Sequence, residues 1–279
     1  HMKPTITHVS AILLIALLLA CNDIKESSKV SEKERTQVEM VTNYGTMQIE
    51  LYDETPLHRD NFLNLAKNKA YDSLLFHRVI NTFMIQAGDP DSKKATSTDT
   101  LGDGDAPYLV QAEFNDSLFH KKGVLAAARD NNPERASSAM QFYIVQGKVF
   151  NDSLLNLAEE RINKMKAARY FEMKPIKIAL LDSLENAMSM GDFEKYNDFG
   201  NRIWEMAKVE KDFAPYTIPA YQRDVYKTIG GTPHLDQNYT VYGEVISGLE
   251  VIDSIAKAPT SPLDRPLKDV RILEVNVIE

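Results

Sequence analysis

The chain has 279 residues, 43% of them hydrophobic, which is enough to bury the core of one or two domains. Its 40 acidic residues outnumber its 32 basic ones and give a formal net charge of −8, and no basic patch is visible along the chain. The charge therefore argues against nucleic acid or an anionic lipid surface as a partner.

Residues 1–21 are predicted to be a signal peptide that ends in a lipidation site. His1 precedes an initiator-like Met2 and is set aside as an added residue. The apolar run from Val9 to Ala20 is shorter than the roughly 20 residues that a membrane-spanning helix needs. Its ending, Leu-Leu-Ala-Cys, resembles the bacterial lipobox, so Cys21 is expected to carry a lipid anchor. The alternative is an ordinary cleavage site that happens to precede the chain's only cysteine.

The next segments are predicted to be a tether and a β-hairpin. Residues 22–37 are polar and charged, with few large apolar side chains, so they are expected to form a disordered linker. From residue 38 the apolar residues alternate with polar ones. Residues 38–42 and 46–52 flank a turn that contains Gly45, and this arrangement predicts two antiparallel strands.

A helix and a series of short strands follow the hairpin. Thr55 and Pro56 suit the N-cap and first position of a helix that ends near Lys69. Further strands are predicted at 75–80, 83–87, 109–114, 123–128 and 140–145. The loop between Asp89 and Pro107 contains several aspartates, but their spacing does not match a calcium-binding EF-hand loop. We expect a solvated loop there.

Residues 148–231 differ from their surroundings because their apolar residues have helical spacing. One pattern follows the cap at Asn151, a second runs from Ile176 to Met188, and a third begins after Gly191-Asp192. A shorter pattern spans 219–229. The strand pattern returns after Gly231, with strands at 239–246 and 270–278 and a helix at 248–258. The segment 148–231 is therefore predicted to be a helical insertion in a strand-rich fold.

The stretch Phe76–Pro90, FHRVINTFMIQAGDP, places one arginine among apolar residues. In an extended strand Arg78 would lie beside apolar side chains, and a buried arginine needs an acceptor. The amide oxygen of Gln86 could supply it, while Phe83 and Met84 could line a pocket next to the guanidinium. An apolar pocket with one fixed cationic donor and no nucleophile suits a reaction that breaks no bond.

This stretch resembles the signature of the cyclophilin-type peptidyl-prolyl cis/trans isomerases. Three further segments recur in the family's order: GVLAAAR at 123–129, AMQFYIV at 139–145 and GGTPHLDQNYTVYGEVISGLEVIDSI at 230–255. The resemblance implies a mainly β fold, an eight-stranded antiparallel barrel capped by two helices at 56–69 and about 248–257. Residues 38–147 and 232–279 would form the barrel, with 148–231 inserted as an α-helical subdomain.

The resemblance also implies the site residues. Arg78 would be the catalytic arginine and Gln86 its positioning partner. The substrate-binding set would comprise Phe83, Met84, Ala128, Arg129, Gln141, Phe142, Tyr143, His234, Leu235 and Tyr239. Within this set, Phe83, Met84 and Phe142 would form the walls of the proline pocket. No metal or cofactor is implied.

Some positions depart from the family's usual residues. Tyr143 replaces a usual Phe, and His234 stands where many members have Trp, which puts strong cyclosporin binding in doubt. Arg129 replaces a usual Asn, and a side chain that faced the groove would favour acidic residues near the proline. Met140 and Ala87 are further departures.

The same residues have alternative roles. Arg78 could instead form a structural salt bridge, for example with Glu50 or Asp89. The histidines show no HxH or HExxH spacing for a metal, and no nucleophile elbow for a hydrolase is present. The helical segment could simply pack on the barrel, or it could bind clients or a partner through aromatic residues such as Phe213 and Tyr221.

The sequence therefore predicts a lipid-anchored bacterial prolyl isomerase that acts on proline-containing polypeptides and assists protein folding in the cell envelope. Asn22 is not the Asp that retains some lipoproteins at the inner membrane, so the outer membrane is favoured, with a periplasmic or surface-facing orientation. The rival predictions are a cyclophilin-like binding or chaperone module with little or no turnover, and a purely structural lipoprotein.

Overall fold

The computed structural model describes residues 34–175 and 178–278. The predicted signal peptide, Cys21 and most of the predicted tether lie outside the described residues. The folded unit begins at Arg35, whose guanidinium forms ion pairs with Glu50 at 3.1 Å and Glu54 at 2.6 Å. The first strand begins at Gln37, so the last residues assigned to the tether belong to the folded unit.

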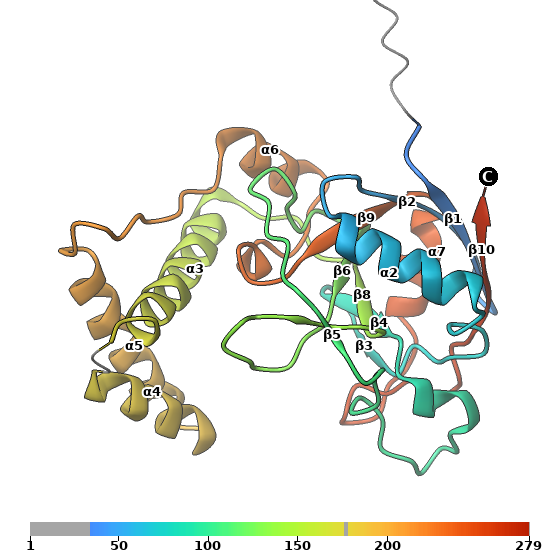
Figure 1. The fold of residues 1–279 in the computed structure, drawn as a ribbon, viewed down its shortest axis with the longest axis horizontal. Coiled ribbons are helices and arrows are strands. Elements are labelled where there is room, and N and C mark those ends of the chain that lie inside the picture. The colour runs from blue at the N-terminus through green and yellow to red at the C-terminus, as the bar shows by residue number, and fades with distance from the viewer. Residues whose placement is uncertain (1–33, 176–177, 279) are drawn as a thin grey trace, which may run out of the picture. The chain divides into compact units, whose positions relative to one another are not determined.

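In this unit, eight strands form one antiparallel sheet in the order β10-β1-β2-β9-β6-β8-β4-β3 (Figure 1). Their bounds are β1 (Gln37–Thr42), β2 (Gly45–Leu51), β3 (Arg78–Ile80), β4 (Met84–Ala87), β6 (Val124–Ala127), β8 (Phe142–Val145), β9 (Val241–Ser247) and β10 (Ile272–Ile278). A separate pair joins β5 (Leu109–Val110) to β7 (Ser137–Ser138). The predicted eight-stranded antiparallel fold is confirmed.

The two ends of the sheet meet just outside the named strands. The amide of Ser73 donates to the carbonyl of Ile272 at 2.9 Å, and that of Phe76 donates to Val270 at 2.8 Å. Phe76 lies in residues 75–77, which were predicted as strand but lie outside the named strands, so β3 is shorter than predicted and starts at Arg78. The sheet curls so that one face encloses a core and the other looks outward.

The inward face is covered by two helices, α2 (Pro56–Lys67) and α7 (Leu249–Ala256) (Figure 1). Phe62 of α2 and Ile252 of α7 are buried in the same apolar core as the inward residues of the strands. This core contains the 27 buried residues of the largest cluster, so it carries most of the barrel's hydrophobic stabilisation. Both helices were expected from the sequence.

The start of α2 is held in an unexpected way. Thr55 stands at the N-cap position, but its side chain makes no capping hydrogen bond, and its hydroxyl is buried without a partner in the described residues. The carboxylate of Glu113 instead accepts hydrogen bonds from the amides of Leu57 and His58, each at 3.0 Å. Glu113 lies in the segment 111–114, which was predicted as strand and is irregular in the structure.

The segment 148–231 forms helices α3 (Asp152–Glu172), α4 (Ala179–Ser189), α5 (Phe193–Ala207) and α6 (Ala220–Thr228). The predicted cap is present, because the side chain of Asn151 accepts from the amide of Leu154 at 2.9 Å. The second helix begins at Ala179, later than predicted, and Ile176 lies outside the described residues.

The insertion leaves and rejoins the barrel at one point. The amide of Lys148 donates to Gly231 at 3.2 Å, and the amide of Gly231 donates back to Lys148 at 3.0 Å. Gly147 has φ +66°, and a Cβ atom there would lie 2.4 Å from the Cα of Gly231. Glycine is required because the two chains approach too closely for a side chain.

Two small cores hold the insertion together. One joins Leu155 of α3 and Tyr226 of α6 to Phe119, which belongs to a barrel loop, and so fixes the base of the insertion. The other joins Phe171 of α3 to α4 and α5, where Ile203 is fully buried. Among the described helices, none combines the length and apolar character needed to cross a bilayer.

Candidate active site

The site lies on the outward face of the sheet. Along a strand, side chains alternate between faces, so Met84 and Gln86 of β4 and Tyr143 of β8 point away from the enclosed core. We call the apolar side chains gathered there the outer cluster: Tyr52, Met84, Val124, Ala126, Tyr143, Val145 and Val241, with the partly buried Ile80, Phe83, Leu118, Ala128, Leu235 and Tyr239. It contains most of the predicted substrate-binding residues.

Phe142 is not part of this cluster, and its assignment to the wall of the proline pocket is wrong. Its side chain is 0% exposed and packs inside the barrel, where it meets the rings of Phe62, Tyr71 and Phe76 edge to face. Because faces alternate along β8, the neighbouring Tyr143 occupies the position on the outward side. Tyr143 contacts Tyr239 edge to face, with ring centroids 5.9 Å apart.

A chain of polar side chains crosses β3, β4 and the edge of β8. Arg78 and Gln86 are direct partners in the antiparallel ladder, and Arg78 Nη1 lies 3.5 Å from Gln86 Oε1. The amide nitrogen of Gln86 donates to Gln141 Oε1 at 3.1 Å. Gln86 is thereby oriented with its oxygen toward the guanidinium, as the sequence predicted.

Gln141 is itself anchored by the loop that follows β4. Its amide nitrogen donates to the carbonyl oxygens of Gly102 and Gly104, both at 2.8 Å. The loop is in turn fixed to the strand region, because the carboxylate of Asp105 accepts from the amides of Ala139 and Met140. Asp89, Asp99 and Asp105 of this loop thus accept hydrogen bonds from backbone amides. In the described residues no group of three or more histidine, cysteine or acidic side chains is placed to hold a metal ion.

Arg78 is more accessible than a residue among apolar neighbours was expected to be. Its side chain is 46% exposed, and Nε lies 3.6 Å from the carboxylate of Asp264. Neither Glu50 nor Asp89 pairs with it: Glu50 pairs with Arg35, and Asp89 accepts backbone amides of its own loop. The guanidinium is held from both sides, by Gln86 and Asp264, and still faces solvent.

Asp264 could not be identified from the sequence, because it lies in the Pro-rich loop before β10, far from Arg78 along the chain. The contact depends on a backbone bond in which Val79 donates to the carbonyl of Asp264 at 2.8 Å. Asp264 also has φ +63°, a conformation that costs a non-glycine residue energy.

His234 covers one side of the outer cluster. Its ring stacks on Phe83 with centroids 5.6 Å apart and planes 22° apart. Burial lowers the pKa of His234 to about 4, and the nearby charges of Arg161 and Lys148 act in the same direction. The imidazole is therefore neutral at neutral pH and serves as a flat, weakly polar wall.

This shift predicts an acid-sensitive contribution to stability. His234 binds a proton less readily in the folded state than in the unfolded chain, where its pKa is about 6.5. Burial of the neutral ring therefore contributes its full share of unfolding free energy above pH 6.5, and this share is lost as the pH falls toward 4. Between pH 7 and about pH 4, wild type should lose about 2–3 kcal/mol more unfolding free energy than His234→Phe, which keeps the stacked ring. Urea unfolding of both proteins measures this difference, and parallel pH dependences would contradict it.

Arg129 lies at the rim of the outer cluster. Its guanidinium carbon is 4.9 Å from the ring centroid of Tyr239, a cation–π geometry. Nη2 donates to the side chain of Asn238 at 2.7 Å, and Nε donates to the Asn238 carbonyl at 3.1 Å. The side chain is thus fixed beside the predicted groove.

A buried polar network lies beneath the site. His120 Nδ1 is 2.8 Å from Asp236 Oδ1, and His120 Nε2 is 2.9 Å from the hydroxyl of Tyr143. The hydroxyl of Tyr226, on α6 of the insertion, donates to Asp236 Oδ2 at 2.6 Å. The network thus links a wall of the site to the insertion. No spacing signal in the sequence connects His120 to Asp236.

Comparisons with known proteins agree with this geometry. The family model described as "Cyclophilin type peptidyl-prolyl cis-trans isomerase/CLD" matches residues 37–159 and 224–277, and the unmatched stretch between them falls within the helical insertion. A putative peptidyl-prolyl cis-trans isomerase of Staphylococcus aureus is 30% identical over 253 residues, which cover 90% of this chain and 96% of that protein. A putative bifunctional phosphatase/peptidyl-prolyl cis-trans isomerase of Streptococcus pyogenes is 29% identical over 87% of this chain and 39% of its own length.

Solved structures show the same fold. The crystal structure of a cyclophilin-type peptidyl-prolyl cis-trans isomerase from Cryptosporidium parvum has a TM-score of 0.51 and 17% identity, and covers 88% of this chain and 98% of that one. A second structure of that protein, in the presence of the dipeptide Ala-Pro, has a TM-score of 0.50 with 17% identity, over 87% of this chain.

Proposed function

The chain belongs to the cyclophilin-type peptidyl-prolyl cis-trans isomerases, and we propose that it catalyses rotation about Xaa-Pro bonds at the outer cluster, with Arg78 as the catalytic group. The observation that carries the assignment of Arg78 is its position. The guanidinium is oriented by Gln86 and Asp264, is 46% exposed, and stands on the same face of the sheet as the apolar side chains of the outer cluster.

The reaction needs only a donor and a pocket. A planar peptide bond is stabilised by delocalising the nitrogen lone pair, and rotation costs about 18–20 kcal/mol. In the twisted state the prolyl nitrogen becomes pyramidal and can accept a hydrogen bond. Arg78 would donate to this nitrogen more strongly in the twisted state than in the planar ground state, which lowers the barrier.

The surrounding residues would hold the substrate. The apolar side chains of Phe83, Met84 and Tyr143 suit the proline ring, with Leu235 at the rim. Gln141 and the backbone at Ala128 and Arg129 would hold the flanking chain. No covalent intermediate is formed, and no proton has to leave the enzyme.

The direct test is exchange between the cis and trans forms of a short Ala-Pro peptide, followed by NMR exchange spectroscopy. The protein from residue 22 onward should accelerate an interconversion that takes tens of seconds or more unaided. If it does not, the proposed catalytic site is inactive, and the rival of a peptide-binding module without turnover takes its place. The oriented and accessible Arg78 does not favour that rival.

We further propose that the enzyme works in the bacterial cell envelope, anchored by a lipid at Cys21 and favouring the outer membrane. The support is the sequence pattern alone: an apolar leader, a Leu-Leu-Ala-Cys ending and a polar stretch up to the first residues of the folded unit. This arrangement would let the isomerase reach exposed prolines of polypeptides that fold outside the cytoplasm.

The anchor can be tested by metabolic labelling with an alkyne-bearing fatty acid in a Gram-negative host. The wild-type protein should incorporate the label and sediment with the outer membrane, and Cys21→Ser should lose both properties. Ser28→Ala, next to the same leader, serves as the control and should behave like wild type. Label retained by Cys21→Ser would show that the anchor lies elsewhere.

A further inference from the structure

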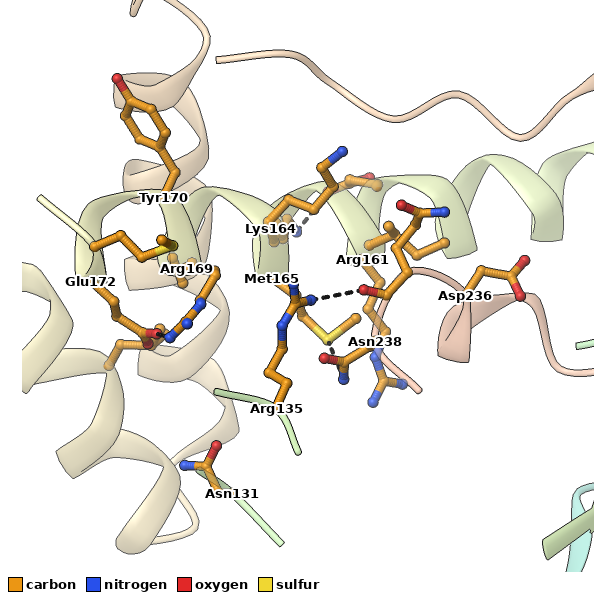
Figure 2. Close-up of a pocket in the computed structure, with 18 of the residues that line it drawn as sticks. Asn131, Arg135, Arg161, Lys164, Met165, Arg169, Tyr170, Glu172, Asp236 and Asn238 are labelled. Atoms are coloured by element: carbon orange, nitrogen blue, oxygen red, sulfur yellow. Dashed lines mark hydrogen bonds and ion pairs between the residues drawn. The ribbon is translucent and has the colours of Figure 1, made fainter. Parts of the chain in front are cut away.

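A cavity of about 1000 Å³ lies between the helical insertion and the rim of the barrel (Figure 2). One side is formed by α3 and its neighbours α4 and α5. The other side is formed by the loop 129–135 and by residues 236–238, which lie directly before the Tyr239 of the outer cluster. The volume is large enough for several residues of an extended polypeptide.

The cavity gathers positive charges that have no acidic partner. In the described part of the chain, no carboxylate lies within ion-pair distance of Arg129, Arg135, Arg161 or Lys166. The carboxylates that line the cavity already have partners: Glu160 has Lys164 at 2.6 Å, Glu172 has Arg169 at 3.5 Å, Asp212 has Lys174 at 3.0 Å and Asp236 has His120 at 2.8 Å. Four unpaired cations on one cavity are notable in a chain of net charge −8.

These cations act on one another. Burial lowers the pKa of Arg135, and the charges of Arg169 and Arg129 lower it further, with a smaller opposing effect of Glu172. Burial also lowers the pKa of Lys166; the charge of Asp116 opposes this shift, and the charge of Arg135 adds to it. Figure 2 shows Arg135 reaching from its loop toward Met165 and Asn238. A negative group placed here would relieve the repulsion between neighbouring cations.

The cavity adjoins a smaller hollow that reaches the edge of the active site. A second hollow of about 230 Å³ is lined by Phe83 and His234 on one side and by Leu157 and Arg161 of α3 on the other. Leu157 and Arg161 also line the large cavity. The two hollows therefore lie on either side of the same α3 side chains, and a polypeptide at the outer cluster has the cationic cavity as its neighbour along α3.

The walls also offer apolar surface. Leu157, Met188 and Phe193 line the cavity and are 61%, 55% and 67% exposed, respectively. Exposed large apolar residues that lie together with cations suit an occupant that is both apolar and acidic. A basic partner would not match these features.

We propose that this cavity binds a second segment of the client polypeptide, one rich in Asp or Glu with interspersed large apolar residues, while a proline of the same client occupies the outer cluster. The inference rests on the proposed function, because it requires the outer cluster to be the proline site. It defines the substrate class as prolines that have an acidic, partly apolar segment within reach of the cavity.

The first test is direct binding, independent of isomerisation. A fluorescein-labelled, proline-free peptide of about ten residues, containing Glu, Leu and Ser, spans up to about 35 Å when extended. Fluorescence anisotropy with the chain from residue 22 should show binding, and replacing each Glu by Gln should weaken it about tenfold. The difference should shrink as NaCl approaches about 1 M, where the screening length is about 3 Å.

Variants locate the binding. The double variant Arg161→Gln, Lys166→Gln should weaken acidic-peptide binding about fivefold to tenfold, since it removes two of the unpaired charges. The matched control, Arg202→Gln on α5, removes an exposed arginine that does not line the cavity, and it should bind like wild type. Thermal unfolding of the variants checks that their folds are unchanged.

The second test uses one peptide that can reach both sites. A peptide that carries Ala-Pro together with the acidic segment, placed before or after the proline, should show a lower KM than its Gln counterpart in at least one of the two arrangements.

The outcomes separate the two proposals. If the short Ala-Pro peptide is isomerised but the acidic peptides neither bind nor show a lower KM, the cavity proposal is overturned while the proposed function stands. If the short peptide is not isomerised, the proposed function fails, and anisotropy still tests the cavity. A dimer that the double variant dissociates would identify a second copy as the occupant and would also overturn the proposal.

Discussion

Replacing Arg78 by alanine is expected to lower kcat/KM for an Ala-Pro peptide roughly 100- to 1000-fold, because a hydrogen-bond donor positioned at the reacting atom is worth about 2.7–4 kcal/mol. The loss should fall mainly on kcat, since the guanidinium would interact with the prolyl nitrogen in the twisted state, whereas the outer cluster would still hold the ring. Stability should change little, because the side chain is 46% exposed and its contacts with Gln86 and Asp264 are long, at 3.5 and 3.6 Å.

Arg202→Ala supplies a closely matched control for this experiment. Arg202 is also an exposed arginine, 58% accessible, with an aspartate 3.9 Å away, but it lies on α5. Its replacement should leave the isomerisation rate unchanged. NMR exchange spectroscopy on the two variants and wild type decides the question, and an Arg78→Ala enzyme within a factor of about three of wild type would exclude Arg78 as the catalytic group.

Replacing Asp236 by alanine is expected to destabilise the protein by about 3–5 kcal/mol. Its carboxylate is 2% exposed and meets the backbone amide of His120, the ring of His120 and the hydroxyl of Tyr226. Removing it leaves these buried polar groups without an acceptor. The loss should also loosen the insertion from the barrel and free Tyr143, which His120 holds at 2.9 Å, so isomerisation should fall as well.

Two comparisons separate this effect from a general loss of charge. Tyr226→Phe removes one bond of the network and should cost about 1 kcal/mol. Asp224→Ala, on the same helix, removes an exposed aspartate with 74% accessibility and should be nearly neutral. Urea unfolding monitored by tryptophan fluorescence, with Trp204 in the insertion, gives all three values. A cost below about 1 kcal/mol for Asp236→Ala would show that the network does not join insertion and barrel.

The elements most clearly predicted from the sequence were those with strong local signals. The hairpin around Gly45, helix α2 after Pro56 and helix α3 after Asn151 each have a turn or cap residue next to a regular apolar pattern. The pairing of Arg78 with Gln86 was also predictable, because both residues lie in one short motif.

The features that could not be predicted from the sequence depend on contacts between segments that are far apart in the chain. The motif QFY did not show which of Phe142 and Tyr143 faces outward, because both are aromatic and a shift of one residue exchanges the faces of a strand. Asp264 reaches Arg78, and Glu113 reaches the start of α2, only after distant segments have paired. The cationic cavity is likewise invisible in a chain whose charges are scattered and whose total is negative, because its cations come from separate segments.

The hydrogen-bonded pair of Lys148 and Gly231 marks an insertion site at which the protein could be redesigned. Because the two backbones already touch there, a short turn could replace everything between them without stretching β8 or β9. Such a deletion would remove Tyr226, which packs on Phe119 and donates a hydrogen bond to Asp236. Both residues would then need substitutions that suit their new surroundings. With those two positions substituted, other helical domains could be inserted between Lys148 and Gly231. Each would change which clients bind, while the catalytic residues of the barrel stay the same.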